Sequence, residues 1–183
     1  FSLDAGVGTP ASYVFSATNI YDPNYTGVGH QPMGHDQYVP FFNHYTVLGA
    51  KIAVHGNVYS DTVGSSSWLT CKLNSTTLPA ATNIDQYIEQ RGVAYTFLTT
   101  KGGSHSYGKV KCNYSPKKFF SLKNPSDEHD LRGLLGAGAP AENAYFIVTV
   151  GASNPGDDPV AINCRAIIDY TVLLSERKAL SSS

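Results

Sequence analysis

Residues 90 to 126 of this sequence carry many positive charges and no acid. The basic side chains of the stretch are Arg91, Lys101, Lys109, Lys111, Lys117, Lys118 and Lys123. Aromatic residues lie between them, at Tyr107, Tyr114, Phe119 and Phe120. Amines neutralise phosphates and aromatic rings stack on bases, so this composition predicts contact with nucleic acid. The alternative is that the lysines are scattered solvated positions and the aromatic residues belong to the core.

Charge elsewhere has the opposite sign. The stretch has a net charge of +7, whereas the segments before and after it each have −4. Only one arginine lies in the stretch, and no finger motif or groove-reading helix accompanies it. We therefore expect contact with the backbone of a nucleic acid rather than recognition of a particular base sequence.

The histidines do not form a metal site in the sequence. His30 and His35 are five residues apart on a loop rich in Gly and Pro, with Asp36 beside them. A jelly-roll oxygenase would need a His-x-His pair on a strand with a later Glu and His, and no such pattern occurs. We expect His30, Gln31 and Asp36 to hydrogen-bond the loop to itself or to a neighbouring molecule.

Other catalytic signals are missing. The sequence has no G-x-S-x-G, P-loop or dinucleotide fingerprint. The adjacent carboxylates of Asp157 and Asp158 are able to bind Ca²⁺ at a loop tip, but a solvated turn is the favoured interpretation. We expect no enzyme activity, no catalytic residue, no resident metal and no cofactor.

The composition favours a β protein. The 183 residues include 12 Tyr and 8 Phe, and only 15% of the residues are charged. The three cysteines, Cys71, Cys112 and Cys164, are widely spaced in apolar runs, which predicts buried thiols and a reducing compartment. No apolar run reaches the length needed to span a membrane, so no membrane partner is expected.

The longest irregular stretch is Tyr21 to Tyr45. Its prolines and glycines prevent a helix or strand from running through it, yet it contains six aromatic residues. A connection of about 24 residues is much longer than usual. We expect this loop to pack against its own domain or against a neighbouring copy.

Alternation of apolar and polar residues predicts strands through most of the remaining chain. The expected strands cover residues 12–20, 45–59, 67–73, 93–100, 108–114, 144–150 and 162–174. In residues 108–114, Lys109 and Lys111 share one face. In residues 45–59, Leu48, Ala50, Ile52, Val54 and Val58 share one face, and Lys51, His55 and Asn57 share the other. Short helices are expected at 84–91 and at 127–135, where Ser126 is the predicted N-cap.

Seven or eight strands joined by loops of very unequal length suit a two-sheet sandwich. No βαβ rhythm is present, which disfavours a parallel sheet. Among sandwiches, the jelly roll accommodates long end loops best. An immunoglobulin fold is disfavoured because no cysteine pair brackets Trp68, the single Trp. We predict an all-β chain with a single jelly-roll β-sandwich of about eight antiparallel strands and one or two short helices.

The segment from Asn19 to Tyr38, NIYDPNYTGVGHQPMGHDQY, resembles a segment of the capsid proteins of circovirus-like, Rep-encoding single-stranded DNA viruses. The family pattern is Tyr-Asp-Pro, then Gly-x-Gly-His-Gln-Pro-x-Gly-x-Asp-Gln, followed by an aromatic run that resembles residues 42–52. Weaker similarities occur at residues 114–118, 130–133 and 145–146. The resemblance extends from about Tyr13 to Glu176.

The resemblance implies a jelly-roll coat protein that assembles into a closed icosahedral (T=1) shell around a circular single-stranded DNA genome. The smallest such shells hold sixty copies. The expected location is the virion, with assembly in the host nucleus or cytoplasm, and the host receptor stays unidentified. These proteins usually begin with an Arg/Lys-rich arm that this chain lacks, so we expect such an arm to be missing from it. We expect an arm at 1–11, a capsid domain at 12–176 and a tail at 177–183.

Low charge, many tyrosines and the long apolar loop fit repeated subunit contacts. We expect the loop to lie at a subunit junction through Gly29, His30, Gln31, Pro32, Met33, Asp36, Gln37 and Tyr38. Two alternatives stay open. One is a carbohydrate- or receptor-binding jelly roll that acts as a small oligomer, and the other is a jelly-roll enzyme with a bound metal.

Overall fold

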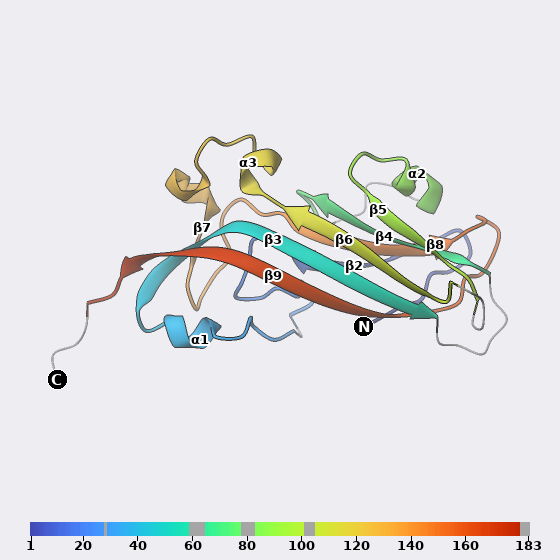
Figure 1. The fold of residues 1–183 in the computed structure, drawn as a ribbon, viewed down its shortest axis with the longest axis horizontal. Coiled ribbons are helices and arrows are strands. Elements are labelled where there is room, and N and C mark those ends of the chain that lie inside the picture. Colours follow the sequence, from blue (N-terminus) through green and yellow to red (C-terminus); the bar gives the residue numbers. More distant parts are fainter. Residues whose placement is uncertain (28, 59–64, 78–82, 101–104, 180–183) are drawn as a thin grey trace. The chain divides into compact units, whose positions relative to one another are not determined.

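The chain folds into β-strands joined by loops and a few short helical turns (Figure 1). The computed structural model describes residues 1–27, 29–58, 65–77, 83–100 and 105–179. The strands are β1 (Ser2–Leu3), β2 (Ala11–Ser16), β3 (Phe42–Val58), β4 (Ser67–Asn74), β5 (Ala94–Leu98), β6 (Tyr107–Tyr114), β7 (Arg132–Leu134), β8 (Tyr145–Ala152) and β9 (Ile162–Arg177). The α-helical turns are α1 (His35–Tyr38), α2 (Ile84–Ile88) and α3 (Pro116–Phe119). The 3₁₀ turns are η1 (Pro125–Asp127) and η2 (His129–Leu131).

Two antiparallel sheets contain these strands. The larger sheet has the order β1-β9-β3-β6, with β7 paired to β3, and the smaller has the order β2-β8-β4-β5. Neighbours within a sheet are mostly distant in the sequence, and the chain passes repeatedly from one sheet to the other. This is the strand order of a jelly roll, which confirms the fold class predicted from the alternation pattern.

The strands belong to two compact units, and several strands contribute residues to both. The first unit contains Phe1–Val14, Ile52–Cys112 and Phe146–Ile168. The fully buried aliphatic side chains and the Phe ring that its strands contribute include Ile52, Val54, Leu69, Leu98, Phe146, Ile147, Val148, Val150 and Ile162. They come from β3, β4, β5, β8 and β9, so the inward faces of both sheets build this core.

The cysteines of this unit are buried, as predicted. Cys71 on β4 and Cys112 on β6 contact each other through their thiols, and this hydrogen bond, together with burial, raises the pKa of the Cys71 thiol. Burial likewise raises the pKa of the Cys164 thiol to about 11. Thiols with raised pKa values stay protonated and are poor nucleophiles at neutral pH.

The second unit contains Phe15–Lys51, Asn113–Tyr145 and Asp169–Ser183. Its centre is Tyr45, whose ring is fully buried and whose hydroxyl donates to the Gly138 carbonyl at 3.2 Å. Gly133 on β7 lies opposite Tyr45 in the strand register, and a Cβ atom there would come within 2.4 Å of the ring. β7 therefore approaches β3 only because residue 133 has no side chain.

The end of β9 is fastened to other parts of this second unit. The Glu176 carboxylate lies 3.1 Å from Arg132 Nη1 and 2.9 Å from His44 Nδ1. Two residues later, the Lys178 backbone N–H donates to Phe41 O at 2.9 Å and its ammonium donates to Val39 O at 2.8 Å. These bonds hold the segment that follows α1 against the last residues of the strand.

The short helix expected at 84–91 is present as α2, capped by the Asn83 side chain, which accepts a hydrogen bond from Gln86 N at 2.9 Å. The prediction of a helix at 127–135 is wrong. This segment forms η1, η2 and β7 instead. Ser126 does not cap a helix, because its hydroxyl donates to Asn124 Oδ1 at 2.9 Å within a tight turn.

The face assignments predicted for β6 and β3 differ in outcome. β6 alternates strictly, with Lys109 and Lys111 exposed between buried neighbours, as predicted. On β3, Ala50, Ile52, Val54 and Val58 are buried as expected, but Leu48 is 39% exposed. Tyr45, Thr46 and Val47 are buried consecutively before it, so the simple alternation does not hold at this end of the strand.

Candidate nucleic-acid interface

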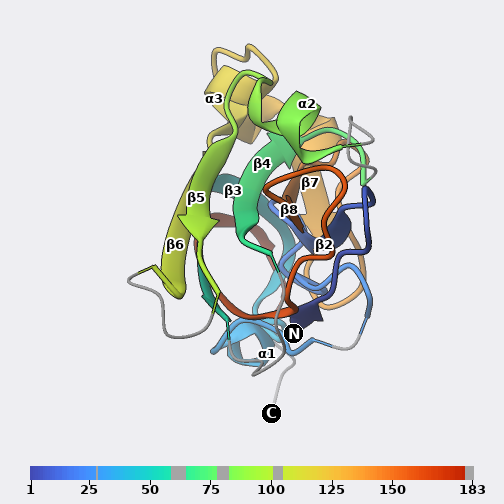
Figure 2. The ribbon, with the colours of Figure 1, turned by 90° about the vertical axis from the view of Figure 1, so that its right-hand side faces the viewer.

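Strand β6 holds the two lysines that the sequence placed on one face. Its inward residues Val110 and Cys112 are buried, so Lys109 and Lys111 must project outward. Gly108 lets β6 approach β5 closely, since a Cβ atom there would lie 2.7 Å from side-chain atoms of Leu98 and Thr96. Figure 2 shows these two edge strands side by side.

The folded sheet brings outward residues of β3 and β9 next to Lys109 and Lys111. β3 lies between β6 and β9, and its outward residues in the first unit include His55 and Asn57. On β9, Asn163 and Arg165 are exposed on either side of the buried Cys164. We call Lys109, Lys111, Arg165, His55 and Tyr107 the basic face. The segments 52–58, 107–112 and 162–168 that carry it contain no Asp or Glu.

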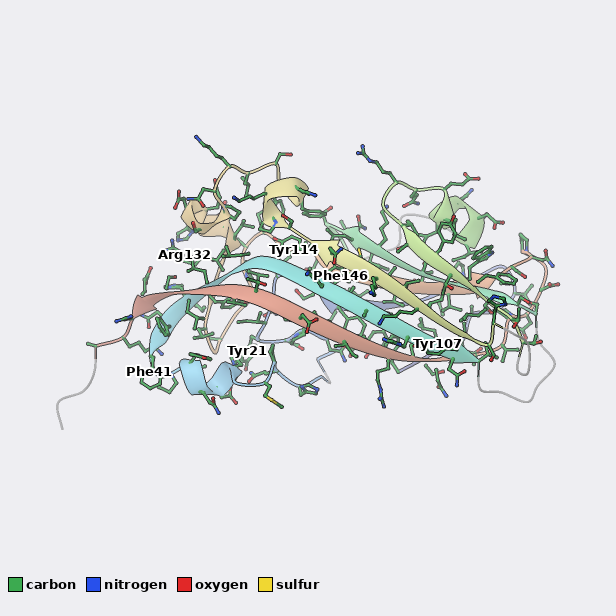
Figure 3. The ribbon with its side chains drawn as sticks, in the orientation of Figure 1. Tyr21, Phe41, Tyr107, Tyr114, Arg132 and Phe146 are labelled. Atoms are coloured by element: carbon green, nitrogen blue, oxygen red, sulfur yellow. The ribbon has the colours of Figure 1, made fainter. Side chains whose placement is uncertain are left out.

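An aromatic pair belongs to this basic face. The His55 and Tyr107 rings have centroids 5.8 Å apart, and the Tyr107 hydroxyl shares a hydrogen bond with His55 Nδ1. Val58 N donates to Ser106 O at 2.9 Å, which fixes the end of β3 beside the start of β6. Tyr107 is 57% exposed and projects from the start of β6 (Figure 3).

The remaining basic residues of the predicted set are distributed differently. Arg91 is exposed just after α2 in the first unit. Lys117 and Lys118 are exposed on α3, and Lys123 is exposed in the loop that follows, all in the second unit. Lys101 lies outside the described residues. The structure therefore places two of the seven predicted residues, Lys109 and Lys111, on the basic face.

Sequence analysis missed His55 and Arg165 as members of this basic face. Both alternate outward on their strands, and that alternation was visible in the sequence. The order β9-β3-β6, which makes them neighbours of Lys109, was not visible there.

The residues expected at a subunit junction lie in and before α1, in the second unit. Met33 is 103% exposed and Tyr38 is 52% exposed, while Asp36 and Gln37 also face outward. Gly34 has a φ of 86°, a left-handed conformation that favours glycine. His35 is the buried residue of α1, and its Nδ1 lies 3.1 Å from the Asp36 carboxylate.

Hydrogen bonds within this loop match the expectation for its polar residues in part. His30 Nδ1 lies 2.9 Å from the Gln31 carbonyl oxygen, and Asp36 pairs with His35. At Gly29, a Cβ atom would come within 2.6 Å of Asn24 Cβ, so the loop closes on itself through this glycine. The loop has a defined shape and presents apolar side chains outward.

A second exposed surface of the first unit is aromatic. Trp68 on β4 contacts Phe97 and Tyr95 on β5, with ring centroids 4.9 and 5.6 Å apart. Tyr95 is 55% exposed and Phe97 is 37% exposed. We call these three residues the aromatic patch. Sequence analysis did not single them out, because their contact depends on the β4–β5 register, which pairs Trp68 with Phe97.

In the described part of the chain, no three His, Cys, Asp or Glu side chains form a group able to hold a metal ion. At the NPGDDP turn, the Asp157 carboxylate accepts a hydrogen bond from Asn154 Nδ2 at 3.0 Å. No helix within the described ranges has the length and apolar character required to cross a membrane.

Comparison with known proteins gives a match of fold. No family model matches the sequence, and no curated protein matches it either. A chain in the structure of Cocksfoot mottle virus is 12% identical with a TM-score of 0.52, and the match covers 97% of this chain and 90% of that chain. Chains from sacbrood virus of honeybee (10% identity, TM-score 0.47) and Desmodium yellow mottle tymovirus (12%, 0.43) are less similar. These two matches cover 98% and 100% of this chain, and 95% and 88% of those chains.

Proposed function

We propose that this chain is a viral coat protein whose copies assemble into a closed icosahedral shell around single-stranded nucleic acid. The observation that carries the proposal is the jelly-roll strand order, which matches a chain of Cocksfoot mottle virus over nearly the whole length of both. The role is structural rather than enzymatic, and the protein is located in the virion.

Two outward surfaces of the first unit support this role. The aromatic patch exposes three contacting rings on the smaller sheet, and exposed aromatic clusters mark sites of protein contact. The basic face lies on the larger sheet and suits the phosphates of a genome. In a shell, the first surface is suited to neighbouring copies and the second to the interior.

The finer features of the proposal come from the resemblance in residues 19–38. They are a circular single-stranded DNA genome, a shell of sixty copies, and assembly in the host nucleus or cytoplasm. The likeness to Cocksfoot mottle virus is one of fold and supports the coat-protein role. The exposed loop from Gly29 to Tyr38 is the proposed subunit junction.

The test is the mass of the assembled protein, measured by light scattering after gel filtration and by negative-stain imaging. We expect uniform spheres with sixty times the chain mass of 19.6 kDa, about 1.2 MDa. A stable dimer or trimer, both with this chain and with a chain that carries a basic N-terminal arm, would contradict the proposal. That result would favour a receptor- or carbohydrate-binding module.

A further inference from the structure

Tyr107 is fixed in its position although more than half of it is exposed. Its hydroxyl is hydrogen-bonded to His55 on the neighbouring strand, and the two rings are tilted by 41°. A tyrosine has only two side-chain torsions, and the bond to His55 restricts both. A ligand that stacks on this ring therefore loses little free energy in ordering it.

Cations surround this aromatic pair along two directions of the sheet. Lys109 and Lys111 follow Tyr107 on the same outward face of β6, at intervals of about 7 Å. Arg165 lies on β9, on the far side of β3, about 10 Å from β6. An anionic chain that crosses the basic face thus meets positive charges on both sides of the His55–Tyr107 pair.

We propose that the His55–Tyr107 pair is a stacking site for an unpaired base, with Lys109, Lys111 and Arg165 binding the adjacent phosphates of the same strand. This inference rests on the proposed function and adds that the basic face selects single-stranded over double-stranded nucleic acid. Bases of a duplex are stacked on each other inside the helix, and only an unpaired base has a face available to a side chain. The site therefore prefers single strands, without selecting a base sequence.

Tyr25 and the aromatic patch lack this combination of a histidine-bonded ring and nearby cations. Tyr25 packs edge-on against Tyr145, and the rings of the aromatic patch also contact each other edge-on. On the strand that carries Trp68, the side chain of Lys72 is hydrogen-bonded to Gln90. Tyr25 is 57% exposed, the same fraction as Tyr107, and serves as a matched control for a tyrosine outside the basic face and the aromatic patch.

The experiment is fluorescence anisotropy with a labelled oligothymidine and with a duplex of the same length. For Tyr107→Leu we expect the affinity for the single strand to fall about tenfold, because one stacked base is lost. Its affinity for the duplex stays within about twofold, since the phosphate contacts remain. Tyr107→Phe retains the ring but loses the hydrogen bond to His55, so its affinity for the single strand falls less than that of Tyr107→Leu. Tyr25→Leu binds like the unaltered protein. Thermal unfolding of each variant checks that it is folded.

Salt dependence separates stacking from charge. Lys109→Gln with Lys111→Gln lowers the slope of log affinity against log salt by about 1.4 for the single strand, whereas Tyr107→Leu leaves the slope unchanged. A second probe uses Tyr107→Trp in a Trp68→Phe background, where stacking on the oligothymidine quenches the emission. An unquenched Trp, or a Tyr107→Leu variant with unaltered preference for single strands, overturns the proposal.

The outcome for the stacking site is distinct from the outcome for the coat-protein role. Particles of the expected mass that bind single strands independently of Tyr107 overturn the stacking site and leave the coat-protein role standing. A small oligomer whose preference for single strands depends on Tyr107 supports the stacking site and contradicts the coat-protein role.

Discussion

Single residues decide where strands are able to meet in this protein. Gly108 permits the contact between β6 and β5, and Gly133 permits the contact between β7 and the Tyr45 ring. In both places the nearest atoms are less than 3.0 Å from where a Cβ atom would lie. The absence of a side chain is therefore a packing requirement there, independent of backbone conformation.

Gly133→Ala tests this requirement in the second unit. The Tyr45 ring is fully buried and its hydroxyl is hydrogen-bonded, so it has little freedom to move away from a new methyl group. We expect a loss of about 1–3 kcal/mol in the free energy of unfolding, measured by chemical denaturation. Gly138→Ala is the control, because nothing lies within 4 Å of a Cβ atom at that position. Equal stability of the two variants would contradict the interpretation.

At the scale of elements, alternation in the sequence was sufficient to predict most strands. β6 and β9 begin and end within three residues of the predicted ranges, because each has one face against the core. The segment 127–135 was mispredicted as a helix because Ser, Asp and Glu in sequence suit both a helix start and a tight turn. β7 is decided by its pairing with β3, a long-range contact that local sequence does not contain.

The candidate site was predictable to the same limited degree. Lys109 and Lys111 were placed on one face because their spacing on a strand is a local property. Arg165 and His55 join them only through the strand order of the folded sheet. The net charge along the sequence gave no reason to expect Arg165 in a nucleic-acid site, since this residue lies in a segment of net charge −4.

The loop that contains α1 is the element on which assembly is proposed to depend. Asp36→Ala with Gln37→Ala removes two exposed polar side chains from α1, and we expect particle formation to be lost while the chain stays folded. Asp85→Ala with Gln86→Ala changes the same residue types at equivalent positions of α2, where both are exposed, and is expected to preserve particles. Gel filtration and circular dichroism distinguish the outcomes, and normal particles from the α1 variant would refute this role.

At the scale of the whole molecule, stability depends on large buried tyrosines in both units. Burial raises the pKa of Tyr87 to about 12, and it also raises the pKa values of Tyr45, Tyr114 and Tyr170. Each of these phenols is neutral in the folded chain and hydrogen-bonded or packed inside it. The stability that these tyrosines contribute is the same at neutral and at acidic pH, because a phenol does not lose its proton at either.

Alkaline pH is therefore the condition that unfolds this protein through its tyrosines. An unfolded tyrosine has a pKa of about 10, and the folded state holds the proton more tightly. The stability from these groups is complete below pH 10 and is lost as the pH rises toward 12. We expect phenolate absorbance from the buried tyrosines to appear together with loss of the β-sheet circular dichroism signal. Ionisation of these tyrosines in a still-folded chain would contradict this.

The bonds from Lys178 to Val39 and Phe41 have a consequence for the timing of maturation. The partners of the Lys178–Val39 bond are separated by 139 positions, so the segment after α1 receives this support only after Lys178 has been made. Contacts of such long sequence separation form late in folding. During synthesis, the loop that is proposed to recognise other copies thus lacks this support until Lys178 has been added.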